Sequence, residues 1–383
     1  MSKLEKLIQD LCPNGVEYKQ ISEVIKIARG VRVVRNQLTE MGKYPVFQNS
    51  MTPLGYYERS NCSANTTFVI AAGAAGEVGY SRSEMWAADD CFYFNCLTDI
   101  SSRYLYYALI SNQHFLLSNV RKSSVPRLPR QALENLKIPV PSLPVQEEIV
   151  RILDNFTELT AELTAELTAR KKQYAYYMNE LLTFQKDVNI LSLRSIVKHS
   201  CSGGTPTKGN ADFYNNGNIP WIRTQDVKFN EIYKVDSFIT EYAVQKTAAK
   251  WIPKNCVIIA ISGATAGRCA INKIETTTNQ HCLNLEIDPS KALYKYVFYC
   301  VCNKYQELLS KKQGVRGDLN SSLVLETKIP VPPLEEQERI VAILDRFDKL
   351  CNDISEGLPA EIEARQKQYE YYRDKLLSFK PAE

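Results

Sequence analysis

The feature that most constrains the fold is an internal repeat. Residues 138–157 and 329–348 are identical at 13 of 20 positions, at an offset of 191. Residues 170–184 and 365–379 are identical at nine of 15 positions, at an offset of 195. The second copy therefore contains four additional residues, which is close to one helical turn. Self-similarity of this kind predicts two tandem halves of about 190 residues each.

Each repeated segment is predicted to be a long helix, because its apolar residues recur at steps of three and four. Thr-Glu-Leu and two Thr-Ala-Glu-Leu units fill residues 157–167 of the first copy. The apolar spacer positions that we assign are Phe156, Leu159, Leu163, Leu167, Phe347, Leu350 and Ile354. Two similar apolar stripes on one chain predict an antiparallel coiled-coil pair. Gly357 and Pro359 predict a possible break in the second helix near residues 355–359.

The segments that precede the helices are predicted to be globular α+β lobes. Short runs rich in β-branched and aromatic residues, such as Val31–Val34 and Cys282–Ile287, indicate strands, and helical stretches follow them. The expected fold class is α+β, with two tandem globular domains separated by two long helices and related by a pseudo-two-fold. The predicted boundaries are 1–141 for the first lobe, 142–186 for the central helix, 187–332 for the second lobe and 333–383 for the distal helix.

Charge is divided unevenly between these parts. The first lobe carries a net charge of +4 and the second +6, whereas the two helical segments carry −2 and −4. The whole-chain value of +4 conceals this division. Basic lobes combined with acidic helices predict that the lobes, and not the helices, contact a polyanion such as nucleic acid.

Two kinds of polar segment in each lobe suit contact with DNA. A strand-end segment (residues 48–50 and 223–225) follows a proline-containing strand, and its side-chain types can hydrogen-bond to base edges. A basic loop (residues 120–130 and 311–320) precedes each Lys-Ile-Pro-Val-Pro motif and suits phosphate contacts. The candidate residues are Gln48, Asn49, Ser50, Arg121, Lys122, Arg127, Arg223, Thr224, Gln225, Lys311, Lys312 and Arg316. Solvated surface loops are the alternative, but the same placement in both lobes favours a function.

Motifs for catalysis are missing from the sequence. The glycine-rich segments 71–79 and 261–269 fit neither a P-loop nor a dinucleotide-binding fingerprint, and we interpret them as tight turns after buried strands. The Asn/Asp-Pro-Pro-aromatic motif of adenine methyltransferases is absent. Asp318 with Glu326 and Lys328 resembles a nuclease triad only superficially, since the first lobe has no equivalent. We therefore predict no catalytic residues.

Cysteine usage and hydropathy indicate the compartment. The 11 cysteines include no Cys-x-x-Cys pair, and only three histidines are present, so reduced thiols are favoured over disulfides or a metal site. No run of 18 apolar residues predicts a membrane helix, and the charged start of the chain does not resemble a signal peptide. The expected location is the cytoplasm.

The repeated motifs resemble those of specificity subunits of type I restriction-modification systems. Each Ile-Pro-Val-Pro motif leads into Val-x-Ile-Leu-Asp-x-Phe, at residues 150–156 and 341–347. Arg-Lys-Lys-Gln-Tyr from Arg170, Arg-Gln-Lys-Gln-Tyr from Arg365 and the Thr-Ala-Glu-Leu units complete the resemblance. It covers essentially the whole chain, and the lobes match only loosely.

The resemblance implies a non-catalytic subunit that serves DNA methylation and phage defence. Each lobe would be a target-recognition domain that reads one half of a bipartite site on double-stranded DNA. The helices would set the spacing between the halves and dock two methyltransferase subunits, which nuclease–translocase subunits then join. S-adenosylmethionine, ATP and magnesium would bind to these partners, and this chain would hold no cofactor.

Two alternatives come from other classes of protein. A self-sufficient DNA enzyme would carry a methyltransferase or nuclease motif, and none is found. A coiled-coil scaffold would have no reason for basic lobes and would not bind duplex DNA. The residues thus favour a recognition module.

Overall fold

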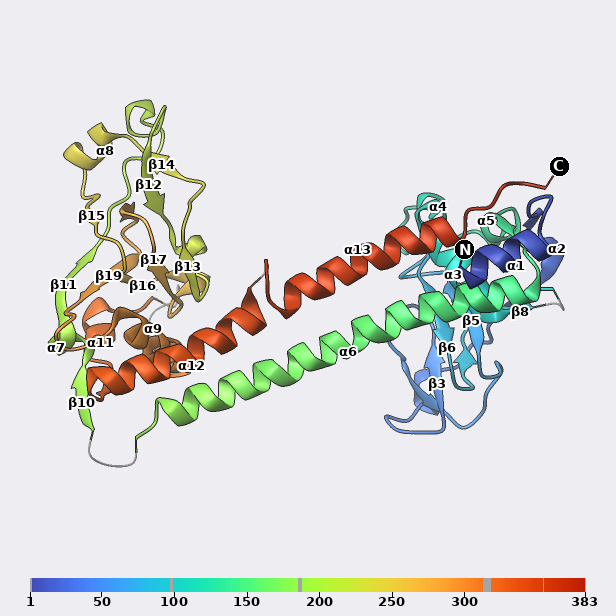
Figure 1. The fold of residues 1–383 in the computed structure, drawn as a ribbon, viewed down its shortest axis with the longest axis horizontal. Helices are drawn as coiled ribbons and strands as arrows, with labels where there is room; N and C mark the ends of the chain where they lie inside the picture. The colour runs from blue at the N-terminus through green and yellow to red at the C-terminus, as the bar shows by residue number, and fades with distance from the viewer. Residues whose placement is uncertain (1, 97–98, 185–187, 313–317, 354, 383) are drawn as a thin grey trace. The chain divides into compact units, whose positions relative to one another are not determined.

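The computed structural model describes residues 2–96, 99–184, 188–312, 318–353 and 355–382 (Figure 1). The chain forms two compact units, one of Met1–Thr164 with Glu361–Glu383 and the other of Ala165–Ala360. Each unit contains one mixed lobe of helices and sheets together with parts of the long helices. The predicted fold class is therefore confirmed.

The first lobe is built on an antiparallel four-stranded sheet. Its strands are β1 Tyr18–Gln20, β2 Ile25–Arg29, β3 Tyr44–Phe47, β4 Gly55–Tyr57, β5 Thr66–Ile70, β6 Val78–Ser81, β7 Trp86–Ala87, β8 Cys91–Cys96 and β9 Lys137–Pro139. Its helices are α1 Lys3–Leu11, α2 Ile21–Val24, α3 Ser102–Ser111, α4 Gln113–Ser118 and α5 Arg130–Glu134. The main sheet has the order β2-β8-β5-β6, a smaller sheet has the order β4-β3-β7, and β1 pairs with β9.

The second lobe repeats this plan. Its strands are β10 Asn189–Ser192, β11 Val197–Ser202, β12 Ile219–Ile222, β13 Asn230–Ile232, β14 Phe238–Ile239, β15 Trp251–Ile252, β16 Val257–Ala260, β17 Cys269–Asn272, β18 Thr276–Thr278, β19 Cys282–Ile287 and β20 Lys328–Val331. Its helices are α7 Leu193–Ile196, α8 Glu241–Lys246, α9 Tyr294–Asn303, α10 Tyr305–Ser310 and α11 Ser321–Leu325. The sheet β11-β19-β16-β17-β13 corresponds to β2-β8-β5-β6, and β10 pairs with β20 as β1 pairs with β9.

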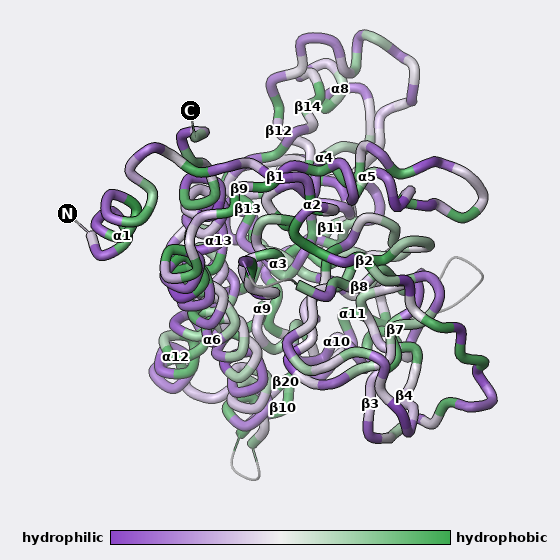
Figure 2. Tube along the Cα trace, turned by 90° about the vertical axis from the view of Figure 1, so that its right-hand side faces the viewer, coloured by the Kyte–Doolittle hydropathy of each residue, from purple (hydrophilic) through white to green (hydrophobic). Residues whose placement is uncertain are grey.

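Three long helices carry the repeated segments: α6 Leu143–Leu181, α12 Leu334–Asn352 and α13 Leu358–Leu376. In the first unit α6 pairs with α13, where Phe156 stacks on Tyr372 with ring centroids 5.4 Å apart. In the second unit the end of α6 pairs with α12, where Tyr174 stacks on Phe347 at 6.0 Å. Hydrophilic and hydrophobic residues mix along all three helices (Figure 2). Each pair is antiparallel, because the end of one helix meets the start of the other.

A turn separates α12 from α13. The Gly357 amide donates to the carbonyl of Asp353 at 3.1 Å. A Cβ on Gly357 would lie 2.6 Å from the carbonyl oxygens of Asp353 and Lys349, so no larger residue fits without displacement of the backbone. Pro359 follows as the second residue of α13, where a missing amide hydrogen costs nothing. The second copy of the repeat therefore consists of two helices.

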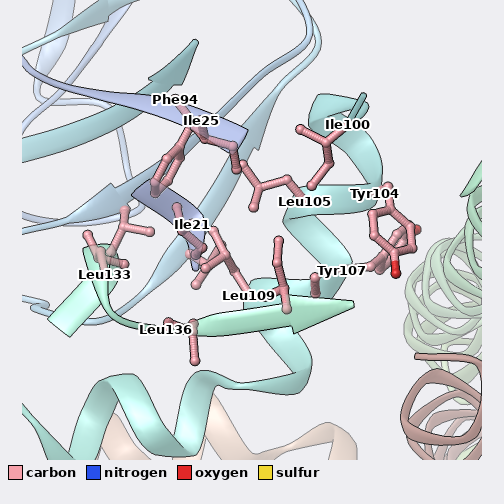
Figure 3. Packing of buried hydrophobic residues seen from close by; sticks show 14 of the residues in the cluster. Ile21, Ile25, Phe94, Ile100, Tyr104, Leu105, Tyr107, Leu109, Leu133 and Leu136 are labelled. Atoms are coloured by element: carbon pink, nitrogen blue, oxygen red, sulfur yellow. The ribbon is translucent and has the colours of Figure 1, made fainter. Parts of the chain in front are cut away.

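The core of the first unit lies between the main sheet and the long helices. Leu105 and Leu109 of α3 are fully buried and face Ile21, whereas Tyr104 and Tyr107 point away from it, towards the long helices (Figure 3). Each fully buried side chain of this kind contributes about 1.5–3 kcal/mol of transfer free energy. The helix α3 thus packs on the sheet with one face and on α6 with the other.

One strand prediction was wrong. Val31–Val34 forms no strand, although Cys282–Ile287 matches β19 over its whole length. The Val31 amide does donate to the Ala87 carbonyl at 2.9 Å, but the segment makes no further ladder and Val31 is 55% exposed. A run of valines needs a continuous partner strand to become part of a sheet. Among the described residues, none of the helices combines the length and the hydropathy of a membrane-spanning segment.

Candidate nucleic-acid interface

Three segments that the sequence analysis treated separately meet in the first lobe. The Ala74 amide in the glycine-rich turn donates to the Asn49 carbonyl of the strand-end segment at 2.9 Å. The Gly73 amide donates to Pro126 of the basic loop at 3.1 Å. Gly73 has a φ of +88°, and a Cβ there would lie 2.6 Å from the Asn49 oxygen. The glycine-rich turn thus holds the other two segments together, as a tight turn and not as a phosphate cradle.

The basic loop of the first lobe is a small hairpin. Arg121 and Arg127 exchange backbone hydrogen bonds of 2.8 and 3.2 Å, and the Leu128 amide donates to Ala71 at 2.8 Å. The side chains of Arg121, Lys122 and Arg127 are all exposed. No carboxylate of the described residues forms an ion pair with any of the three. These three cations are therefore available to an anionic partner such as a phosphate backbone.

Few side chains of the strand-end segment of the first lobe are engaged in hydrogen bonds within the protein. The buried Cys91 thiol donates to the Gln48 carbonyl at 3.1 Å, which fixes the backbone beneath the segment. Burial raises the pKa of this thiol, so it stays protonated. Asn49 is exposed and Gln48 is half-buried. The Ser50 hydroxyl donates to the Thr52 carbonyl at 2.9 Å. The amides of Gln48 and Asn49 are thus held on a fixed backbone next to the basic hairpin.

The strand-end segment of the second lobe forms a short 3₁₀ turn over Thr224–Asp226. The Arg223 amide donates to the Asp226 carboxylate at 2.8 Å. Gln225 is exposed, while Arg223 and Thr224 are half-buried. Cys282 is the equivalent of Cys91, 191 positions later. Burial and the nearby Asp226 raise the pKa of Cys282 to about 12.

The second lobe also brings its glycine-rich turn to its basic loop. The Leu319 amide donates to the Ile261 carbonyl at 2.8 Å, which matches the bond from Leu128 to Ala71. The Ser262 hydroxyl donates to Asp318 at 2.5 Å. Lys311 pairs with Glu307 at 2.6 Å, and this contact lowers the pKa of Glu307. Lys312 is half-buried after α10, and Arg316 lies outside the described residues.

The predicted spacer residues lie on the long helices with different exposures. Phe156 and Phe347 form the aromatic stacks between helices, and Leu163 and Leu167 are half-buried. Leu159 is 38% exposed and Leu350 is 37% exposed, so neither is fully covered by the partner helix. Ile354 lies outside the described residues.

The sequence analysis missed a pair of glutamine clamps. Gln146 is fully buried: its Nε2 donates to the carbonyls of Asp99 and Pro141 at 2.8 Å, and its Oε1 accepts from the Ser101 amide at 2.9 Å. Gln337 makes the equivalent bonds in the second unit. The signal was available, because this glutamine is identical in the two copies of the repeat.

No group of three or more His, Cys, Asp or Glu side chains in the described part of the chain is arranged to hold a metal ion. All eleven cysteines are free thiols, and seven of them are buried. What the two lobes share is a basic loop, a glycine-rich turn and a polar strand-end segment.

Comparisons with known proteins agree with this description. The profile of the family described as type I restriction modification DNA specificity domain matches residues 13–170 and 185–364. The chain is 44% identical over 257 residues to the specificity subunit of the type I restriction enzymes EcoR124I and EcoR124II of Escherichia coli, a match that spans 63% of each chain. It is 32% identical to a putative type I restriction enzyme specificity subunit of Haemophilus influenzae, over 98% of each chain.

Solved structures share the fold. The S subunit of a type I restriction-modification system from M. genitalium superposes with a TM-score of 0.66 at 17% sequence identity, over 95% of this chain and 96% of that one. An HsdS subunit from Thermoanaerobacter tengcongensis gives a TM-score of 0.51 at 14% identity, over 96% of each chain. Identities this low indicate a common fold alone.

Proposed function

The chain belongs to the family of type I restriction-modification specificity subunits, and from this we propose that each of its lobes reads one half of a bipartite target on double-stranded DNA. The lobes act in tandem on one duplex. The helices that join them set the distance between the two half-sites. The bases of the two halves follow from the side chains that each lobe presents, which differ between the lobes at every strand-end position.

The observation that carries the proposal is the duplicated arrangement in the lobes. In both, a basic loop is tied to a glycine-rich turn through the same backbone bond, from Leu128 to Ala71 and from Leu319 to Ile261. In the first lobe, the glycine-rich turn holds Asn49 next to the hairpin that carries the exposed cations Arg121, Lys122 and Arg127. Cations contact phosphates and fix register, while side-chain amides distinguish base edges. Two such surfaces on one chain suit a target in two halves.

The long helices are proposed to dock two methyltransferase subunits, one on each unit. Both units expose a tyrosine pair at equivalent positions of the repeat. Tyr176 is 61% exposed and Tyr177 is 43% exposed; Tyr371 is 61% exposed and Tyr372 is 40% exposed. Exposed tyrosines are enriched where proteins bind one another. The same pair in both units supports two copies of the same partner.

This chain is proposed to take no chemical step itself. The methyltransferase subunits would bind S-adenosylmethionine and methylate adenine, and nuclease–translocase subunits would use ATP and magnesium. The chain would place these partners at one DNA site. Self-contained methylation or cleavage by the chain would contradict this division of labour.

Reconstitution tests the proposal. The chain is combined with a type I methyltransferase subunit from the same host, labelled S-adenosylmethionine, and genomic DNA from a strain that lacks this chain. We expect methyl transfer only when both proteins are present, and none with DNA from the parent strain, whose sites are already modified. Equal transfer by the methyltransferase subunit alone would contradict the proposal.

A further inference from the structure

A half-buried carboxylate joins the first lobe to the long helix α6. Asp154 of α6 accepts hydrogen bonds from Nε and a terminal nitrogen of Arg103 at 2.8 and 2.6 Å, and a further bond from the Tyr107 hydroxyl. Arg103 and Tyr107 lie one turn apart on α3. The side chains of Arg103 and Asp154 are only 16% and 27% exposed. We call this group the first clasp.

Aromatic rings enclose the cation of the first clasp. The Arg103 guanidinium lies 4.4 Å from the ring centroid of Tyr80, 4.8 Å from that of Tyr106 and 4.9 Å from that of Tyr107. Such contacts stabilise a guanidinium in a defined orientation. Burial and the bond to Asp154 raise the pKa of Tyr107, so its hydroxyl remains a donor. Every polar group of the clasp is thus held in one geometry.

The second unit has a clasp of the same design. Asp345 of α12 accepts from Lys295 at 2.8 Å and from the Tyr299 hydroxyl at 2.6 Å, and both donors lie on α9. Asp345 is 191 positions after Asp154, and Lys295 and Tyr299 are 192 positions after Arg103 and Tyr107. The cation differs, however, because Lys295 has a second carboxylate partner, Glu231, at 3.4 Å in place of the aromatic rings. Both units therefore join the lobe to the long helix through an aspartate and a cation, but the groups that surround the cation differ.

The first clasp is connected to the recognition surface of its lobe through hydrogen bonds between α3 and β5. In the first unit, the Thr67 amide of β5 donates to the Ser102 hydroxyl at 3.0 Å, and the Thr67 hydroxyl donates to the Ser102 carbonyl at 2.6 Å. These bonds fasten the start of α3 to β5. The strand β5 leads into the glycine-rich turn, which holds Asn49 and the basic hairpin. A change in how α3 sits on α6 would therefore move the recognition surface as a body.

The lobes need more than apolar packing to be held in one orientation. Apolar burial is non-directional, so it permits small rotations of a lobe on its helix. Hydrogen bonds to a carboxylate are strongly directional, and satisfied buried networks specify a single arrangement. One base pair of spacing corresponds to about 3.4 Å of rise and roughly 34° of rotation. A lobe that rotates on its helix by a fraction of this angle would accept more than one gap length.

We propose that the clasps at Asp154 and Asp345 are positioning devices that restrict recognition to a single gap length between the half-sites. This rests on the proposed function, since a gap exists only if the two lobes read one bipartite target. Asp154 and Asp345 contact no base themselves. They act through α3 and α9, by fixing the orientation in which each lobe presents its own half of the recognition surface.

The test uses the host genome as a library of substrates. Strains carry the unaltered chain, D154N or D345N together with the native methyltransferase subunit, and methylated adenines are mapped genome-wide. Asparagine keeps the size of the side chain and an acceptor for the tyrosine hydroxyl, but loses the charge that the cation requires. For each strain, methylation is compared at the native gap and at the same two halves with the gap one base pair shorter or longer.

Matched controls remove a carboxylate elsewhere on the same helices. E158Q changes α6 one turn beyond Asp154, where Glu158 pairs with Arg82 at 3.7 Å with both side chains exposed. E338Q changes an exposed residue of α12. Y107F and Y299F remove one donor from each clasp and conserve the ring, so they keep the proposal testable if an asparagine variant fails to fold.

Loss of a clasp is expected to raise methylation at the altered gaps, relative to the native gap, about tenfold. The controls should keep the ratio of the unaltered chain. A variant that lowers methylation at all gaps in proportion would overturn the proposal, because the clasp would then only stabilise the fold. If the unaltered chain directs no bipartite methylation at all, the proposed function itself fails, and the clasp proposal fails with it.

Discussion

Gln146 and Gln337 occupy the same place in the two copies of the repeat, and each donates from Nε2 to the carbonyl of a proline five residues earlier, at 2.8 Å in both cases. Each amide oxygen also accepts a backbone amide at 2.9 Å, from Ser101 or Leu293. The glutamine thus joins three parts of its unit: the boundary proline segment, the start of a lobe helix and the long helix itself.

Removal of either glutamine should destabilise its unit strongly. Q146A or Q337A removes three hydrogen bonds made by a fully buried side chain, which at about 1 kcal/mol each we expect to cost about 3 kcal/mol. Thermal unfolding followed by circular dichroism measures this as a lowered melting temperature. Q131A, at an exposed site on α5, serves as the control and should melt with the unaltered protein. Equal melting temperatures for all variants would contradict the clamp.

Glu148 should stabilise the first unit at neutral pH and lose this effect at acid pH. Arg151 and then Lys3 lower the pKa of this 4% exposed carboxyl to about 2, from 4.5. Because the pKa is lower in the folded chain, the stabilisation is complete above about pH 4.5 and is lost as the pH falls towards 2. E148Q should therefore cost about 2 kcal/mol at pH 7 and almost nothing at pH 2.

Melting curves of E148Q at a series of pH values measure this difference. E147Q changes the neighbouring exposed carboxylate and should follow the unaltered chain throughout. A destabilisation by E148Q that stays constant from pH 7 to pH 2 would show that the ion pairs are not its cause.

The basic hairpin of the first lobe should contribute salt-dependent affinity for DNA. R121A, K122A and R127A each remove an exposed cation, and each lost phosphate contact should lower the slope of log affinity against log salt by about one. Binding to duplex DNA is measured by fluorescence anisotropy at several salt concentrations. K172A, on the long helix, should leave the slope unchanged. If the hairpin variants and the helix variant have the same slope of log affinity against log salt, the DNA does not contact the basic hairpin.

The tetrapeptide repeat of α6 should act as a ruler. Deletion of Thr164–Leu167 shortens the helix by about 6 Å and nearly preserves its facing, since four residues are close to one turn. DNA rises about 3.4 Å per base pair, so the accepted gap should change by roughly one or two base pairs. The methylated motif of the deletion strain reveals the new gap. Unchanged spacing would mean that α6 does not set the distance.

The repeat made the helices and the tandem plan predictable. Long apolar stripes leave few alternatives to a helix, and the strand predicted at Cys282–Ile287 is present. The segments 71–79 and 261–269 were correctly interpreted as tight turns, because glycines after a buried strand are typical of a reversal, and Gly73 and Gly267 have positive φ. The wrong strand at Val31–Val34 shows the limit: composition does not reveal whether a partner strand is within reach.

The interior contacts were harder to predict, for a physical reason. Gln146 and Asp154 are identical in the two copies, which marks them, but a polar residue on a helix is normally solvated. Only the fold reveals that Asp154 meets Arg103, 51 positions away. The cation that pairs with Asp345 in the second clasp is Lys295 and not an arginine. Comparison of the two halves of the sequence therefore does not reveal the partner of the aspartate as an identical residue. Contacts between residues that are far apart in the sequence can be identified only from the structure.

The most direct test of the central claim is a genome-wide map of methylated adenines, with the gene for this chain intact and deleted. The deletion is complemented by the gene on a plasmid, and the methyltransferase subunit is present and active in every strain. We predict that deletion abolishes one split motif of two halves with a fixed gap, and that complementation restores it. A map that is the same with and without the chain would contradict its assignment as the subunit that reads the DNA target.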